Sequence, residues 1–406
     1  MAKNSIFGMK EKTELNLFDL PENIRVTINV KCSRKIFESL LNRHQSISVA
    51  ARALGLSKGD YLHRYLIKMR SGIPLKLLRK MSFETNITRE EMQASVVEIK
   101  TLKSTKKIRN PILPIRLLTP AFGLVVGGVL GDGGIEKNRR RVSYFSSEPE
   151  QIAGFRQAVL ETFGDVEFAY HRSIGNVPCV LFPKIIGEVL CQIGLEEGNK
   201  NYKHHQGIPK MFMENPKSAA TISLIRRLFD DDGTVAHNHS NRGVELIAPT
   251  IFKEDEKVIE PKVLIDLKKV LEKLSIESRI RDYSPYKKPN SEITHDWELV
   301  INGKKNLQLF HEKIGFGLAR KQVLVEKVIN MYVDGLEFYP RFQAEQSYIS
   351  AIKVMENKKH EITANSLAKE CKRNNRHVRE VLLGLMQKSI VRRELIANKY
   401  VYSLAR

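Results

Sequence analysis

LVVGGVLGDG, at Leu124–Gly133, and LIRRLFDDDG, at Leu224–Gly233, decide how this 406-residue chain is organised, because both end in the same Asp-Gly pair. The pairs Thr119-Pro120 and Asn215-Pro216 precede them. Each pair combines a side-chain oxygen that caps a first turn with a proline that is tolerated at the first helical position. Glycine best takes the left-handed conformation that ends a helix. We therefore predict two helices that both end at an Asp-Gly pair.

Aspartates gather where a helix tolerates them least. Asp132 closes the first run, and residues 230–232, all aspartate, close the second. A helix dipole is negative at its C-terminal end, so an acidic side chain there costs roughly 0.3–1 kcal/mol. One Asp-Gly pair after an apolar helix is often only a solvated turn. Two copies with matching caps predict a bound cation.

The same residues resemble the LAGLIDADG family of homing endonucleases. Val125–Gly133 follows the first-motif form of that family, and Ile225–Gly233 follows the second. The resemblance implies that two motif helices pack side by side and bring Asp132 and Asp232 to a shared divalent-metal site. Mg²⁺ is the expected ion, because it prefers hard oxygen ligands. The other candidate metal-site residues are Gly131 and Asp231.

Small residues are expected where the motif helices meet. Arg227 departs from this pattern, since the family usually has a small residue there so that the helices can approach closely. On the first helix, Gly123, Gly127 and Gly131 form a bare stripe at four-residue spacing that is expected to accept the larger side chain. Asp230 is expected to support the second motif or to cap its turn.

Composition indicates a polyanionic partner, with double-stranded DNA expected and RNA as the alternative. The net charge is +21, the pI is about 9.7, and 42% hydrophobic content is typical of a globular chain. Ala121–Leu130 is far shorter than the roughly 20 residues that span a bilayer. Gly128–Gly134 is not a dinucleotide loop, because the spacing of its glycines is wrong and they close a helix instead of opening one. Membrane association is therefore not expected. We expect a cytoplasmic monomer whose cysteines are core thiols without metal-ligand spacing: Cys32, Cys179, Cys191 and Cys371.

After each motif the predicted elements come in the same order: a strand, a helix, two strands and a helix. They lie at residues 141–145, 149–163, 166–171, 177–182 and 183–193 in the first half, and at 243–247, 261–274, 278–284, 297–301 and 307–314 in the second. Two copies of a mixed unit predict an α+β fold of tandem, pseudo-symmetric repeats at about residues 111–212 and 213–338. The resemblance implies that their sheets form a saddle over DNA.

Strand side chains that face away from the helices are the expected readers of base edges. Alternation along the strands selects basic and aromatic residues, each of which is alternatively a plain surface residue. They are Arg141, Tyr144, His171, Arg172, Arg279, Arg281 and Lys287.

Lys200 and Lys321 occupy matching places at the ends of the two halves. In similar enzymes a basic residue in this region polarises the attacking water or offsets charge on the phosphate, so both are catalytic candidates, with Lys203 as an alternative to Lys200. A lysine near a helix end is also favourable by itself. His237 and His239 are expected to lie in a turn, because a pair without a third ligand is a poor metal site.

Residues 1–110 are predicted to form a helical module and a basic linker. Ser46–Met69 indicates a helix, a turn at Gly55 and a second helix capped by Ser57, as in a helix-turn-helix. Lys58 and Arg64 on the second helix are candidate DNA contacts, with an ordinary helical hairpin as the alternative. Residues 25–30 predict a strand. Residues 103–116 predict a basic linker that follows phosphates or is a solvated tether.

Residues 341–406 are predicted to form a separate module. Helices at about 345–357, 366–371 and 375–388, followed by strands at 390–394 and 400–404, resemble a winged helix. Val378, Leu382 and Leu385 have inward spacing. Arg376 and Arg379, at the start of the third helix, are candidate DNA contacts. Winged helices also mediate protein contacts, which is the alternative.

Together these features predict a site-specific, divalent-metal-dependent endonuclease that hydrolyses phosphodiester bonds in double-stranded DNA. The expected catalytic residues are Asp132, Asp232, Lys200 and Lys321. Two alternatives stay open: a DNA-binding transcription regulator on the same scaffold that does not cleave, and an RNA maturase that assists intron splicing.

Overall fold

The computed structural model describes residues 13–102, 104–172, 175–202, 205–237, 242–252, 258–287, 292–332, 344–371 and 373–405. The chain divides into two compact units, Met1–Asp231 and Asp232–Arg406, and each is described by itself. None of the helices within these ranges is long and apolar enough to cross a membrane.

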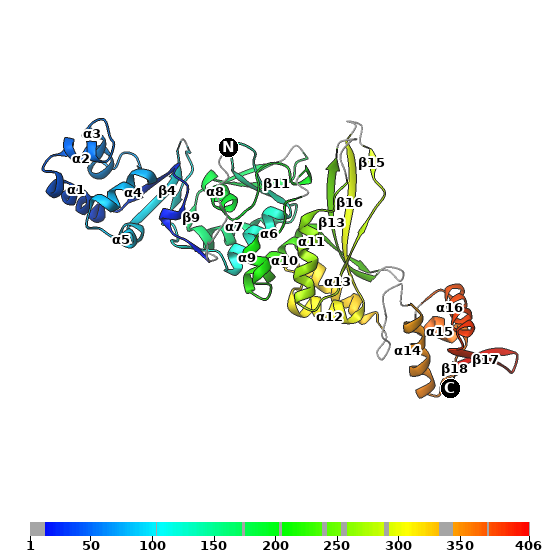
Figure 1. Cartoon of the computed structure of the whole chain (residues 1–406). Helices are drawn as coiled ribbons and strands as arrows, with labels where there is room; N and C mark the ends of the chain where they lie inside the picture. Colours follow the sequence, from blue (N-terminus) through cyan, green and yellow to red (C-terminus); the bar gives the residue numbers. More distant parts are fainter. Residues whose placement is uncertain are drawn as a thin grey trace. The chain divides into compact units, whose positions relative to one another are not determined.

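The N-terminal module of the first unit is mixed α/β, whereas a helical module was expected. Its strands pair in the order β3-β2-β4-β5-β9, and alternate residues of β2 (Ile24–Ile28) are buried, as in a sheet with one covered face. The other elements include β3 (Ile73–Pro74), β4 (Val96–Thr101), α1 (Val30–His44), α2 (Ile47–Ala53), α4 (Leu75–Glu84) and α5 (Arg89–Ala94) (Figure 1).

The predicted helix-turn-helix segment has the expected first helix and turn. Ser46 accepts a hydrogen bond from the backbone N–H of Val49 at the start of α2, and Gly55 has a φ of 77°. The prediction that Ser57 caps the second helix is wrong. α3 (Asp60–Leu62) begins after Gly59, where an added Cβ would lie 2.7 Å from Ile47 Cγ2, and a π-helical turn at His63–Ile67 follows it.

The N-terminal module shares a sheet with the first repeat. β5 (Ile108–Arg109) pairs with β4 on one side and with β9 (Asp165–Val166) on the other. β6 (Ile115–Arg116) pairs with β1 (Glu14–Leu15). Within the predicted linker at residues 103–116, residues 108–109 and 115–116 are therefore built into sheets, and the expected boundary at residue 110 does not separate two structural units.

The first repeat begins with the motif helix α6 (Pro120–Leu130), whose N-cap Thr119 accepts from the backbone N–H of Phe122. α7 (Pro149–Phe163) spans the predicted range. Gly133 begins strand β7 and does not have a positive φ, so the predicted left-handed conformation is wrong. Glycine is needed there for space, since an added Cβ would lie 2.6 Å from the carbonyl oxygen of Gly128. The strand order is β10-β11-β8-β7, formed by β7 (Gly133–Ile135), β8 (Val142–Phe145), β10 (Ala169–Arg172) and β11 (Pro178–Phe182), and α8 (Lys184–Gln192) follows.

The second motif helix, α10, spans Ala219–Asp232. Ser218 Oγ accepts from the backbone N–H of Thr221 over 3.1 Å, so Ser218 caps the helix. The predicted cap Asn215 is wrong, because Asn215 instead ends the short helix α9 (Lys210–Glu214).

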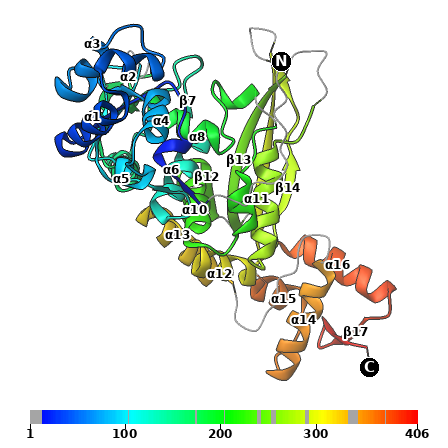
Figure 2. The ribbon, with the colours of Figure 1, turned by 60° about the vertical axis from the view of Figure 1, so that its left-hand side comes forward.

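The second unit repeats the strand order of the first repeat. β12, β13, β16 and β14 are neighbours in that order, and β15 also pairs with β16. Helix α11 runs along this sheet (Figure 2). The elements are β12 (Gly233–His237), β13 (Arg242–Phe252), α11 (Lys262–Lys273), β14 (Arg279–Asp282), β15 (Tyr286–Lys287), β16 (Ile293–Asn302), α12 (Lys304–Lys313) and α13 (Ala319–Asn330).

The C-terminal module has three helices and a hairpin with a core of their own. Val378, Leu382 and Leu385 are fully buried in that core, which matches their predicted spacing. Ala397 and Asn398, with φ of 48° and 63°, form the hairpin turn. The elements are α14 (Ala344–Asn357), α15 (Ala364–Glu370), α16 (Asn375–Gln387), β17 (Val391–Ile396) and β18 (Lys399–Leu404).

The cysteines are unpaired thiols, and Cys32, Cys179 and Cys371 are buried. Burial raises the pKa of Cys179 to about 11 and the pKa of Cys371 to about 12. At neutral pH these thiols are therefore protonated and unreactive.

Candidate metal and nucleic-acid site

α6 and α10 pack closely within the first unit. An added Cβ on Gly123 would lie 2.0 Å from the carbonyl oxygen of Ala220, and one on Gly127 would lie 2.4 Å from that of Leu224. Only residues without a side chain allow backbones to approach this closely. The structure therefore places the predicted glycine stripe at the contact between the two motif helices.

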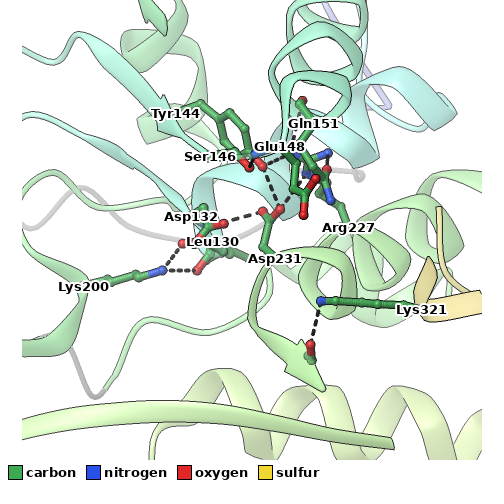
Figure 3. A network of polar contacts seen from close by, with 12 residues as sticks. Leu130, Asp132, Tyr144, Ser146, Glu148, Gln151, Lys200, Arg227, Asp231 and Lys321 are labelled. Carbon is green, nitrogen blue, oxygen red and sulfur yellow. Dashed lines mark hydrogen bonds and ion pairs between the residues drawn. The ribbon is translucent and has the colours of Figure 1, made fainter. Parts of the chain in front are cut away.

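Arg227 points from α10 into the first repeat, where it is buried. Its guanidinium donates hydrogen bonds to the Tyr144 hydroxyl and to Gln151 Oε1. Its Cζ lies 4.5 Å from the centre of the Tyr144 ring (Figure 3). Burial lowers the pKa of Arg227, and nearby carboxylates, first among them Asp231, oppose that shift.

Asp231, one turn after Arg227 on α10, is the counter-charge of that guanidinium. Arg227 Nε lies 3.1 Å from Asp231 Oδ1, and the Asp231 side chain is fully buried. The Tyr144 hydroxyl donates to Oδ1 over 2.7 Å, and the backbone N–H of Asp132 donates to Oδ2 over 3.3 Å. The geometry thus turns Asp231 into the helix interface instead of the predicted metal role. The aspartates at residues 230–232 had led us to predict a bound cation, and at Asp231 the guanidinium of Arg227 supplies that positive charge.

Asp132 lies between the end of α6 and the start of β7, and it is half-buried. Within the described part of the chain its carboxylate has no hydrogen bond or ion pair. Such a carboxylate is the hard oxygen ligand that Mg²⁺ prefers, and water and phosphate oxygens usually complete the magnesium shell. Among the described residues there is no cluster of three His, Cys, Asp or Glu side chains for a metal. Asp132 therefore fits a site of the open, water-rich kind.

The remaining motif acids differ in burial. Asp230 is 7% exposed, in keeping with a supporting role, and Asp232 is the half-buried last residue of α10. Asp132 belongs to the first unit and Asp232 to the second. Their joint coordination of a metal stays a prediction.

Lys200 and Lys321 each bind backbone next to a motif aspartate. Lys200, in the turn η3 (Lys200–Tyr202), donates to the carbonyl oxygens of Gly131 and Leu130, the latter over 3.3 Å (Figure 3). In the second unit, Lys321 of α13 is buried and donates to the carbonyl oxygen of Gly233 over 2.6 Å. Both ammonium groups thus stabilise the end of a motif segment.

His237 ends β12 instead of lying in a turn, and its Nδ1 is 3.2 Å from the carbonyl oxygen of Val235. Lys203 and His239 lie outside the described residues.

The register of the first sheet divides the predicted base-reading residues between two faces. Tyr144 pairs with Val180, and both are fully buried, so the prediction that Tyr144 faces DNA is wrong. Arg172 has the same parity but is exposed at the end of β10. Arg141 and His171 belong to the opposite face, where His171 is exposed. Arg141 forms a two-pronged pair with Glu136, at 2.8 and 3.0 Å.

In the second sheet, Arg279 and Arg281 share the face opposite the buried Leu299. Arg281 donates to Glu298, and this bond is the main cause that raises the pKa of Arg281. The Arg281 Nη2 atom also lies 3.4 Å from Glu245. Both arginines are half-buried. Glu298 and Glu245 hold Arg281 in place and offset its positive charge on this face. Lys287 is exposed on β15.

The candidate residues of the terminal modules lie at the surface. Lys58, Arg64, Arg376 and Arg379 are all exposed. Sequence reasoning missed two exposed aromatic groups in the same modules. Tyr61, 39% exposed, stacks on Tyr65, and helical spacing from Arg64 would have indicated it. Arg393 lies over the exposed ring of Tyr400 at 4.2 Å, which strand alternation in the hairpin would have indicated.

Residues 220–315 match the family model for the LAGLIDADG-like domain. A search of curated protein sequences found no match. Among solved structures, I-DmoI in complex with DNA and Ca is 12% identical, covers 48% of this chain and 88% of its own, and has a TM-score of 0.31. Full-length DUF199/WhiA from Thermatoga maritima is 11% identical, covers 66% and 90%, and has a TM-score of 0.32. These TM-scores are too low to support a functional inference.

Proposed function

We propose that this chain, which carries a LAGLIDADG-like domain at residues 220–315, is a site-specific, divalent-metal-dependent endonuclease that cuts double-stranded DNA. The observation that supports this most is Asp132. Its carboxylate lies at the end of a close-packed motif helix and has no hydrogen bond or ion pair from the described residues. A chain of net charge +21 suits a phosphate backbone as substrate.

Asp132 and Asp232, one from each motif, are the proposed metal ligands. A bound Mg²⁺ would supply an activated water and would stabilise the leaving oxygen of the phosphodiester. Lys200 and Lys321 hold the backbone beside these aspartates, through Gly131 and Gly233. We therefore assign the lysines a role in shaping the motif ends, in place of direct activation of water.

The basic residues outside the motifs are proposed to bind DNA. His171, Arg279, Arg281 and Lys287 lie on strands, and the exposed arginines of α16 add a second contact region. Linked binding surfaces on one chain raise the effective concentration of each for its target. A monomer that holds both motifs needs no partner subunit in this proposal.

Cleavage is tested on a pool of supercoiled plasmids with random inserts, incubated with Mg²⁺, from which cut molecules are recovered by adaptor ligation and sequenced. The wild type is expected to cut a defined sequence. Asp132→Asn is expected to lower the rate on the order of 10²-fold or more, because a metal ligand supports several kcal/mol of transition-state stabilisation. Glu150→Gln, a loss of charge at an exposed position of α7, is the matched control.

Two results would contradict the endonuclease proposal. If the wild type binds plasmid but never nicks it, and Asp132→Asn changes nothing, the chain is a DNA-binding regulator. If structured RNA binds more tightly than duplex DNA at one fixed salt concentration, the maturase is favoured, because electrostatic affinities compare only at equal salt.

A further inference from the structure

Arg227 and Asp231 lie against Gly127 of α6 and against Gly131, the residue that caps the end of α6. An added Cβ on Gly127 would lie 2.9 Å from Arg227 Cβ, and one on Gly131 would lie 2.5 Å from Asp231 Oδ2. The first motif thus leaves room for the pair that the second motif introduces. A buried ion pair is a poor device for stability, because desolvation offsets most of its attraction. Its placement beside Asp132 calls for another explanation.

The pair belongs to a buried relay that ends at a backbone amide. The Tyr144 hydroxyl accepts from Arg227 Nη2 and donates to Asp231 Oδ1 over 2.7 Å. Gln151 holds the guanidinium from α7 through both its side-chain oxygen and its carbonyl oxygen, the latter at 3.4 Å. Asp231 Oδ2 then accepts the backbone N–H of Asp132. Arg227, Tyr144 and Gln151 therefore orient Asp231, and Asp231 binds the residue proposed to hold the metal.

The two poles of one peptide group are held at this point. The N–H of Asp132 and the C=O of Gly131 belong to the same planar peptide unit. Asp231 binds the N–H, and Lys200 binds the C=O (Figure 3). A peptide plane held at both poles cannot rotate, so the position of the Asp132 Cα atom, from which the side chain leaves the backbone, is fixed.

We infer that Asp231 is a positioning residue that aims the Asp132 carboxylate at a divalent metal, with Lys200 holding the opposite pole of the same peptide. This inference rests on the proposed function, since it concerns the metal ligand of that site. It assigns a role to Arg227, the residue that departs from the small one expected in the second motif, because Arg227 orients Asp231. It also predicts that Asp231 and Lys200 act on metal binding without contacting the metal.

Asp231→Asn tests the first pole. An amide has only one oxygen, and its NH₂ group cannot accept a hydrogen bond. The Tyr144 hydroxyl and the Asp132 N–H bind different oxygens of Asp231, Oδ1 and Oδ2, so in the amide one of them faces an NH₂ group and loses its acceptor. Partners that orient a metal ligand typically change metal affinity by about 10- to 100-fold when they are replaced. The dissociation constant for Mn²⁺ alone, measured from the EPR signal of free Mn²⁺ at fixed ionic strength, is expected to rise by that factor.

Lys200→Met tests the bond to the Gly131 carbonyl group. It removes a positive charge, whereas Asp231→Asn removes a negative one. If Lys200 acted only through its charge, its removal would relieve repulsion and tighten Mn²⁺ binding. If it holds the peptide, Mn²⁺ binding weakens, as in Asp231→Asn. The double variant is then expected to lose less than the product of the two single effects, because both side chains act on one peptide.

Thr162→Val is the control for lost buried hydrogen bonding. Thr162 is buried in α7 and donates to the carbonyl oxygen of Ala158 over 2.8 Å. Its change is expected to lower the melting temperature without altering Mn²⁺ affinity. Hydrogen exchange of the peptide covering residues 127–135 is expected to speed up in Asp231→Asn and to stay unchanged in Thr162→Val.

The inference is overturned if Asp231→Asn keeps Mn²⁺ affinity within about twofold of wild type, or if Lys200→Met tightens binding. A failure of the proposed function gives a different result: Asp132→Asn itself would bind Mn²⁺ as the wild type does. In that case the metal site and the positioning role fall together.

Discussion

Glu188 of α8 has three donors, of which Asn23 joins it to the N-terminal module while Arg140 and Lys184 belong to the first repeat. Its carboxylate accepts from Asn23 Nδ2 over 2.9 Å and from Arg140 Nη1 over 2.6 Å, and Lys184 Nζ lies 3.3 Å away. Burial by itself would raise the pKa of Glu188. The hydrogen bonds from Asn23, Arg140 and Lys184 together lower the pKa by more than burial raises it, so the net shift is downward. The folded state therefore binds the Glu188 proton less tightly than the unfolded chain does.

The lowered pKa of Glu188 predicts a pH-dependent contribution to stability. Because the folded pKa lies below the unfolded value of about 4.3, the contribution is complete above that pH and is lost as the pH falls through the folded pKa. Glu188→Gln is expected to cost about 1.5–3 kcal/mol at pH 7, and the difference from wild type should shrink below about pH 4.3. Melting temperatures from pH 7 to pH 3 check this. Exposed Glu161→Gln is the control, and an equal profile in both variants would contradict it.

The sequence predicts the bounds of a helix well when residues next to its ends determine where it starts and stops. α7 begins with Pro149 at its first position and ends before Gly164, whose φ is 98°, so its bounds follow from its own sequence. α6 was expected to carry Asp132 in its last turn, but it ends at Leu130. The Asp132 N–H is bound by Asp231, a contact between distant parts of the chain. Such a contact leaves no trace in the local sequence.

Two glycine-to-alanine substitutions, one at the contact between the motif helices and one away from it, are expected to change the stability in opposite directions. An added methyl group at Gly127 would meet the Leu224 backbone at 2.4 Å, so Gly127→Ala is expected to destabilise by about 1–3 kcal/mol. At Gly154, inside α7, an added Cβ meets nothing within 4 Å. Gly154→Ala is expected to stabilise by roughly 0.5–1 kcal/mol. Calorimetric melting of both variants checks this, and a stabilised Gly127→Ala would exclude the close packing.

At the scale of the whole molecule, the family resemblance is confirmed over residues 220–315. The shared strand order of the two sheets agrees with the predicted tandem repeats. The N-terminal boundary was missed because β9, two residues long, leaves the first repeat to complete the sheet of the preceding module. A pairing over so many residues has no periodicity that a sequence window detects. The joint site of Asp132 and Asp232 stays a prediction.

The shared sheet predicts that the two ends of the chain tolerate removal differently. Deleting residues 1–110 takes β5 from β9 and Asn23 from Glu188, so several kcal/mol should be lost. The melting temperature is then expected to fall by roughly 10 °C, at about 2–4 °C per kcal/mol. Residues 341–406 contain their own core, and their deletion should shift the remaining transition by less than about 4 °C. Equal shifts for both deletions would contradict the shared sheet.

The unlike surfaces of α6 and α10 also bear on how such a gene can evolve. Gly127 and Gly131 accept Arg227 and Asp231, so the two motif helices fit each other as different partners. Two copies of α10 would bring like charges and large side chains face to face, which a two-fold contact between identical surfaces cannot relieve. A chain that held only the second motif could therefore not reproduce this contact by pairing with a copy of itself. The contact between the two motif helices therefore requires one copy of each motif, and a gene that encodes both on one chain meets this requirement.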